Sequence, residues 1–213
     1  MSKLQSRTSE TGFSIEKAIA AFCDEVAADA GRADAVSLYH AVRQLPYLSS
    51  GDRSIEAILT LQAGSCSSKH ILLDRLLARI GVESRVELVQ GDFATPLREA
   101  HGIPAALKAA SVDGIPDVHN VVRATVNGRS VLLDATWNDL VKPFGLRVND
   151  AWDGTGDTAV AADPERFLGP TAEPAAAKAA IIESWPQEVQ KRRRQFLEDI
   201  NAWIVDLEKE RAS

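Results

Sequence analysis

One hairpin turn constrains the fold more than any other feature of the sequence. Two β-rich runs, residues 118–126 and 129–137, flank the dipeptide Asn127–Gly128. An asparagine–glycine pair favours the two-residue type I′ turn, because both residues tolerate positive φ angles and the turn matches the twist of the flanking strands. The sequence therefore predicts an antiparallel β-hairpin over these residues.

The register of this hairpin brings a histidine close to an aspartate. Val126 pairs with Arg129 across the turn, and counting back places Val121 opposite Asp134. His119 is then a diagonal neighbour of Asp134 on the more polar face, about 7 Å away between Cβ atoms and within reach of a hydrogen bond. The opposite face is entirely apolar, which predicts that it is the core side of the sheet; it carries Val122, Ala124, Val126, Val131, Leu133 and Ala135.

A histidine held by a carboxylate is half of a catalytic triad, because the acid fixes the tautomer and stabilises the imidazolium. Cys66 suits the missing role of nucleophile. It follows Gly64 and Ser65, which break the chain, and begins a leucine-rich segment, residues 66–81, that predicts a helix ending at Gly81. A helix N-terminus and a neighbouring imidazolium both favour a thiolate, and its N–H groups can hold an oxyanion. Spacing alone does not show that Cys66 and His119 meet.

Simpler interpretations stand beside these. Cys66 can be a small buried side chain, His119 a surface histidine of the hairpin, and Asp134 an acceptor for a nearby turn. His70 is a rival base one helical turn after Cys66, although no acid is evident to orient it, and it is also a candidate for lining the cleft. Cys23 lies on an apolar helical stripe, and we interpret it as core.

The remaining chain predicts a mixture of helices and strands. Residues 94–116 contain three prolines and predict an insertion over one sheet edge, and residues 138–170 are irregular. A strand is expected over residues 82–90. Helices are expected over residues 14–31, 33–44, 54–61, 66–81, 173–183 and 186–211.

Composition excludes several classes of protein. The chain has 24 basic and 30 acidic residues, a net charge of −6, which disfavours nucleic acid as a partner. Its two cysteines cannot build a disulfide scaffold or a CxxC zinc site, and no apolar run approaches the roughly 20 residues of a membrane span. The N-terminus lacks the apolar stretch of a signal peptide. We expect a cytoplasmic protein without membrane partner, cofactor or metal, and leave the oligomeric state open.

Several motifs together resemble the transglutaminase-like superfamily. Gly64–Ser65–Cys66 precedes a helix that ends in Arg79–Ile80–Gly81–Val82–Glu83–Ser84–Arg85, which is similar to the family's G-x-C, helix and "lGi-x-x-R". His119 and the later Leu133–Asp134–Ala135–Thr136 are similar to its histidine and "lDpT" signatures. Upstream, residues 42–47 also resemble the family's approach to the active site. The resemblance covers about residues 36–137.

The resemblance implies an α+β fold with a papain-like core, in which the helix of the nucleophile packs on an antiparallel sheet and C-terminal helices are added. We expect one domain over residues 1–213, with its core at about 36–137 and a helical extension at about 171–211. Cys66 would be the nucleophile, His119 the general base and acid, and Asp134 the residue that orients His119. The implied reaction is acyl transfer from amides or esters through a thioester. Substrates would be peptides, proteins or small amides and amines.

Two other functions remain open at this point: a non-catalytic interaction module on the same fold, and an N-acyltransferase for a small molecule. Tyr47 resembles the aromatic residue that helps to bind the oxyanion, and Gln62 is a competing donor. The alternative for either side chain is packing or a solvent-facing position. Trp137 is a candidate for the cleft wall, with core packing as the alternative. We interpret Lys69 and the basic run 191–194 as solvent-facing charges. The alternatives for Lys69 are that it lowers the pKa of the Cys66 thiol or contacts an acidic group of the substrate. Lys69, His70, Val121 and Ala135 depart from the family pattern.

Overall fold

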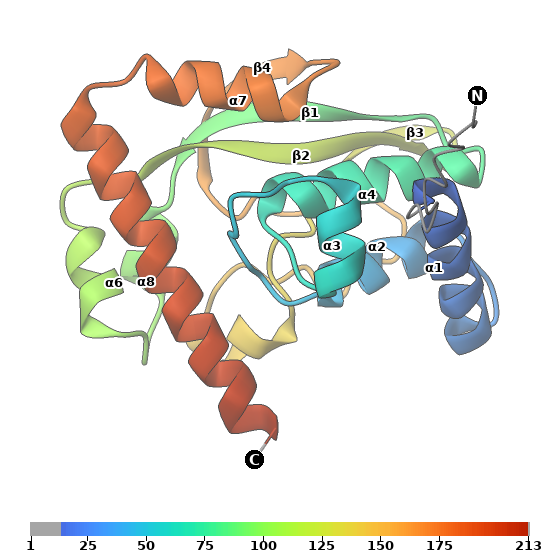
Figure 1. Cartoon of the computed structure of the whole chain (residues 1–213), viewed down its shortest axis with the longest axis horizontal. Helices are drawn as coiled ribbons and strands as arrows, with labels where there is room; N and C mark the ends of the chain where they lie inside the picture. The colour runs from blue at the N-terminus through green and yellow to red at the C-terminus, as the bar shows by residue number, and fades with distance from the viewer. Residues whose placement is uncertain (1–13, 213) are drawn as a thin grey trace, which may run out of the picture.

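The computed structural model describes residues 14–212. It contains a four-stranded antiparallel sheet in the order β3-β2-β1-β4 (Figure 1). Residues 1–13, which belong to the expected domain, lie outside the described residues. Helices before, between and after the strands make the fold α+β, as expected. The strands are β1 (Ser84–Asp92), β2 (Pro116–Val126), β3 (Arg129–Leu133) and β4 (Asp163–Pro170).

Helix α4 (Cys66–Arg79) contacts β1 and β2, and helices α2 and α3 pack against α4 (Figure 1). Helix α7, near the end of the chain, also contacts both β1 and β2, and α8 contacts β2. The other helical segments are α1 (Ile15–Ala30), α2 (Ala35–Gln44), α3 (Ile55–Leu61), α5 (Ala94–Glu99), α6 (Ala105–Ala110), the 3-10 helix η1 (Asp139–Phe144), α7 (Pro174–Glu183) and α8 (Gln187–Ala212).

The helix boundaries follow from capping residues. The hydroxyl of Ser14 accepts a hydrogen bond from the N–H of Lys17 at the start of α1, and Gly31 ends that helix with a φ of 78°. Ser65 caps α4 in the same way, which makes Cys66 its first residue. Gly81 follows α4 with a φ of 77°, the left-handed conformation that terminates helices. The predicted positions of these two helices are confirmed.

The hairpin forms in the predicted register. Asn127 and Gly128 have φ angles of 52° and 73°, and Val126 pairs with Arg129. However, β3 ends at Leu133 rather than at residue 137. The chain leaves the sheet because backbone groups of Asp134 bond outside it: its N–H donates to the Thr158 hydroxyl at 2.7 Å, and its carbonyl accepts from the Tyr39 hydroxyl at 2.9 Å.

The prediction that residues 138–170 are irregular throughout was wrong. The segment contains η1 and the edge strand β4, which pairs with β1 through two irregularities in the register. Most β4 residues are exposed, and the strand contains a glycine and two prolines. A strand of this kind has no alternating pattern of its own, and it forms because β1 offers an unpaired edge.

Two large apolar clusters and one small one pack around the sheet, the small one consisting of Val89, Val121, Leu132 and Val160. The first joins the N-terminal helices to the predicted core face of the hairpin, and includes Cys23 as expected. The second gathers aromatic side chains from distant parts of the chain, among them Tyr47, Phe93, Trp137 and Phe196. No helix within residues 14–212 is both long and apolar enough to cross a membrane.

Candidate active site

The start of α4 presents Cys66 in a buried position, with 3% of its surface exposed. The first N–H groups of a helix have no partner within the helix, and its dipole is positive at this end. Gly64 precedes this start because there is no room for a side chain. A Cβ at that position would lie 2.5 Å from the Ser68 Oγ and 2.7 Å from the Ile58 Cδ1.

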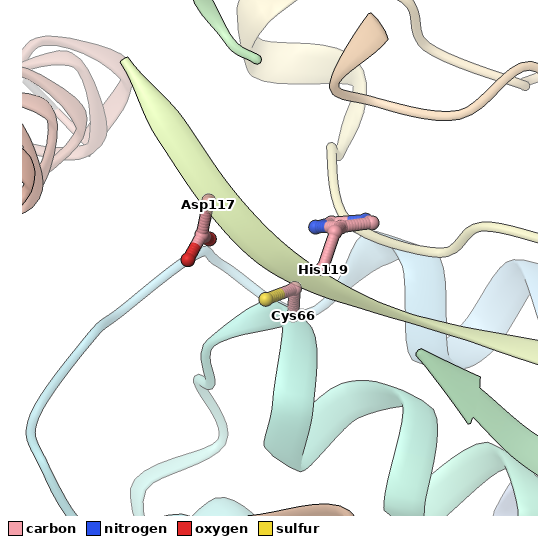
Figure 2. A group of neighbouring side chains, drawn as sticks. All are labelled: Cys66, Asp117 and His119. Carbon is pink, nitrogen blue, oxygen red and sulfur yellow. The ribbon is translucent and has the colours of Figure 1, made fainter. Parts of the chain in front are cut away.

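Strand β2 brings His119 to the thiol. The Cys66 sulfur, a His119 ring nitrogen and a carboxylate oxygen of Asp117 all lie within 4.8 Å of one another. Figure 2 shows Asp117 and His119 projecting from the same strand, with Cys66 beside them at the start of α4. The juxtaposition of Cys66 and His119, which spacing could not decide, is therefore present in the fold.

Asp134 holds the other side of the imidazole. The His119 Nε2 lies 2.8 Å from Oδ2 of Asp134, as the hairpin register predicted. The carboxylate also accepts hydrogen bonds from the backbone N–H groups of Thr136, at 2.9 Å, and Ala161, at 2.8 Å. Because the carboxylate accepts, Nε2 carries the proton. Within residues 14–212 the His119 Nδ1 has no hydrogen-bond partner, which leaves it free to exchange a proton with the thiol.

The charges around these groups favour a thiolate and an imidazolium. Burial opposes ionisation of Cys66, but the charges of Lys178 and His119 outweigh it and lower the pKa of the thiol to about 6. Burial also opposes the charged imidazole, yet Asp134 and the thiolate raise the pKa of His119 to about 10. Asp134 is itself buried, and the charge of His119 holds the pKa of its carboxyl well below the usual range. Near neutral pH the pair is therefore ionised.

A second group of charges adjoins the thiol, and sequence reasoning missed it. The Lys178 Nζ, from α7, lies 3.6 Å from the Cys66 sulfur and 3.3 Å from Oδ2 of Asp117. The Arg193 Nε, from α8, donates to the other carboxylate oxygen, Oδ1, at 2.6 Å. All four side chains are at least 90% buried. Burial disfavours ionisation of Asp117, but Lys178 and Arg193 lower the pKa of its carboxyl.

Signals for these residues were present but weak. Asp117 precedes His119 by two residues on a strand, so the two side chains share a face. Lys178 is the single basic residue of a helix rich in alanine. Arg193 lies three residues before the core residue Phe196 on α8, and its place in the basic run 191–194 made it look solvent-facing. That interpretation was wrong for Arg193, because a buried carboxylate from a distant strand offers it a partner.

Lys69 was also wrongly interpreted as a solvent-facing charge. It is completely buried, and its Nζ donates to the carbonyl oxygens of Arg43, Leu45 and Thr136, each at 2.9 Å. Burial lowers the pKa of Lys69 to about 7. The three carbonyls satisfy the three N–H groups of the ammonium, which makes its burial tolerable.

His70 is not the base that its spacing allowed. Its Nδ1 donates to the Cys66 carbonyl at 2.6 Å, and its Nε2 accepts from the Ala135 N–H at 2.8 Å. Burial, together with the charge of His119, lowers the pKa of His70 to about 4 against the opposing effect of Asp134. Both ring nitrogens are engaged, so a neutral His70 joins α4 to the segment after β3.

Of the two candidate oxyanion donors, Gln62 is at the surface and Tyr47 is buried, and the cleft candidate Trp137 is buried beside Tyr47. Gln62 is exposed, and its amide donates to the Leu59 carbonyl at 2.7 Å, which fits the solvent-facing alternative for this residue. Tyr47 is buried near the thiol: burial raises the pKa of its phenol, and the charges of Cys66 and Asp117 raise it further. Trp137 packs against Tyr47, with ring centroids 5.0 Å apart, in the second apolar cluster. Its position fits the core-packing alternative.

Three side chains of the site carry atoms that can ligate a metal. Cys66, Asp117 and His119 form the one such group of at least three residues within residues 14–212. Both carboxylate oxygens of Asp117 are already bonded, one to Lys178 and one to Arg193. A metal cation would have to displace the ammonium of Lys178, and for that reason we do not treat these residues as metal ligands.

No model of a known protein family matches the sequence, and no curated protein sequence matches it at a significant level.

Proposed function

We propose that this protein is a cysteine-nucleophile acyl-transfer enzyme with a transglutaminase-like, papain-like core. One observation carries the proposal: the Cys66 sulfur lies beside His119, and Asp134 holds the far nitrogen of that imidazole at 2.8 Å. A nucleophile, a base and a group that orients the base form the arrangement that activated thiols use.

The chemistry follows from these positions. The Cys66 thiolate attacks the carbonyl carbon of an amide or ester, and the electron pair of the C=O bond moves to oxygen. Collapse of this tetrahedral oxyanion expels the amine or alcohol, which takes the proton that His119 carries on Nδ1. Water or a second amine then attacks the thioester and gives its proton to His119, and Cys66 leaves as the thiolate. Asp134 keeps Nε2 protonated throughout, because it accepts that hydrogen bond.

The substrates that fit this chemistry are peptides, proteins, or small amides and amines. Hydrolysis and transfer to an amine share the first half-reaction, so the same residues serve both, including an N-acyltransferase reaction on a small molecule. A non-catalytic module on the same fold would not need an activated thiol. The reactivity of Cys66 therefore separates the two classes.

The test is the pH dependence of alkylation by iodoacetamide. Cys23→Ala makes Cys66 the sole cysteine of the chain. We expect the alkylation rate to have its midpoint near pH 6, well below the pKa of about 8.5 of a free thiol. In the same background, His119→Ala should raise the midpoint by about one to three pH units, because one of the two neighbouring cations is lost.

Mass spectrometry of the protein after p-nitrophenyl acetate provides a second measurement. An activated thiol should carry an acetyl group on Cys66, and Cys66→Ala should abolish it. A midpoint near pH 8.5 that His119→Ala does not move would contradict the enzyme and favour the interaction module.

A further inference from the structure

Helix α7 contributes a single buried side chain to the protein, and that side chain is Lys178. The other residues of the helix are five alanines, two isoleucines, a proline and a glutamate, and all of them are half-buried or exposed. Lys178 is 2% exposed, and its ammonium lies 3.6 Å from the Cys66 sulfur. A helix that buries only a lysine, and buries it against a nucleophile, is not explained by packing, since burial of a charge costs free energy.

Charge balance shows that Lys178 is not needed to neutralise Asp117. Arg193 already binds that carboxylate, at 2.6 Å, closer than Lys178 at 3.3 Å. Asp117, Arg193 and Lys178 together therefore carry one positive charge in excess. The Cys66 sulfur, 3.6 Å from the ammonium, can carry a matching negative charge, and the bond formed during acylation moves that charge to the substrate oxygen.

We propose that Lys178 is a further catalytic residue, the cationic donor that binds the oxyanion of the tetrahedral intermediate. This inference rests on the proposed function. The substrate oxygen is two bonds from the Cys66 sulfur, so an ammonium 3.6 Å from that sulfur can stand at the distance of about 2.7–3.1 Å that oxyanion donors need. Asp117, whose other carboxylate oxygen is bound by Arg193, holds the ammonium in place, and the N-terminus of α4 adds backbone N–H groups.

During acylation the negative charge moves from the Cys66 sulfur to the substrate oxygen, and Lys178 stays beside it. Before attack, Lys178 faces the thiolate. The S–C bond forms, the π electrons of the carbonyl move to its oxygen, and Lys178 follows the charge there without giving up a proton. When the C=O bond re-forms, the leaving group departs with the proton from His119, and the thioester remains. Lys178 therefore acts on charge, and His119 on protons.

Two reagents separate this role from a general effect on the thiol. Alkylation by iodoacetamide displaces iodide at a saturated carbon and forms no oxyanion, whereas acylation by p-nitrophenyl acetate passes through one. Both rates are measured for Cys66 in the Cys23→Ala background, at the plateau of each pH profile, so that the thiolate fraction cancels. Both reagents are small, which suits a thiol that is 3% exposed.

The variants are Lys178→Met, which keeps the length of the side chain, and Lys178→Arg, which keeps the charge. We expect Lys178→Met to slow acylation about 100- to 1,000-fold while alkylation changes less than about threefold. Lys178→Arg should recover part of the acylation rate. Lys191→Met, at an exposed position of α8, is the control and should leave both rates unchanged. Circular dichroism checks that each variant is folded.

Three results would overturn the inference. Equal slowing of both reactions would mean that Lys178 only tunes the nucleophile. Faster reaction with both reagents would mean that Lys178 latches α7 over the thiol, and unchanged rates would make it structural. Failure of the proposed function gives a different result, because it shows in the Cys23→Ala protein before Lys178 is changed. In that case p-nitrophenyl acetate would not acylate Cys66, although iodoacetamide would still alkylate it.

Discussion

Replacement of Lys69 by methionine tests whether a buried ammonium stabilises this fold. Its three hydrogen bonds, each of 2.9 Å, join α4 to the carbonyls of Arg43 and Leu45 and to that of Thr136 beyond β3. Lys69→Met keeps the aliphatic chain and removes the donor. The variant therefore isolates the hydrogen bonds from the packing of the side chain.

The expected loss of stability follows from the three carbonyl groups that Lys69→Met leaves without a hydrogen-bond donor. Three buried carbonyls lose a donor at about 1–3 kcal/mol each, which gives a gross loss of about 3–9 kcal/mol. The loss is offset in part, because the variant no longer buries a charge, a cost that also appears as the lowered pKa of Lys69. We expect the free energy of unfolding to fall by about 3 kcal/mol, at the lower end of the gross range.

The assay is urea unfolding followed by circular dichroism at pH 6, where Lys69 is protonated. Lys17→Met, at an exposed position on α1, is the matched control and should change the free energy of unfolding by less than about 0.5 kcal/mol. If Lys69→Met is as stable as the control, the three carbonyls do not depend on the ammonium, and the reasoning fails.

Four further outcomes are expected. Asp134→Asn should slow acylation by p-nitrophenyl acetate by about 10³–10⁴-fold, because His119 loses the acceptor that fixes its tautomer; a normal rate would contradict the triad. Gln62→Ala should leave that rate within about twofold, since the side chain is exposed. The folded-state pKa of Asp117 is lowered, so the carboxylate contributes its full stability above the unfolded pKa of about 3.9. That contribution is lost as the pH falls through the folded pKa. Between pH 5 and pH 3, the free energy of unfolding in urea should therefore fall less in Asp117→Asn than in the parent protein. Gly64→Ala should lower the unfolding midpoint in urea, with a cost of about 1–3 kcal/mol for the contacts its Cβ would make.

The sequence by itself determined the local elements and part of the site. Asn127–Gly128 set the hairpin register, and that register predicted the contact between His119 and Asp134 that forms at 2.8 Å. Ser65 and Gly81 marked the ends of the helix that begins with Cys66. These features can be predicted from the sequence because turn chemistry, capping and residue periodicity depend only on residues that are close together along the chain.

The tertiary structure alone decided which charged residues are buried and what they touch. Lys178 lies 112 residues from Cys66 along the chain, and Arg193 lies 76 residues from Asp117. A lysine or arginine on a helix faces solvent unless a distant segment supplies a carboxylate or carbonyls in the right place, and no local pattern encodes that partner. Strand β4 likewise depends on a distant segment, because it becomes a strand only by pairing its backbone with the open edge of β1. The charge around the Cys66 thiol is therefore a property of the assembled fold, because desolvation and pairing exist only once these segments pack together.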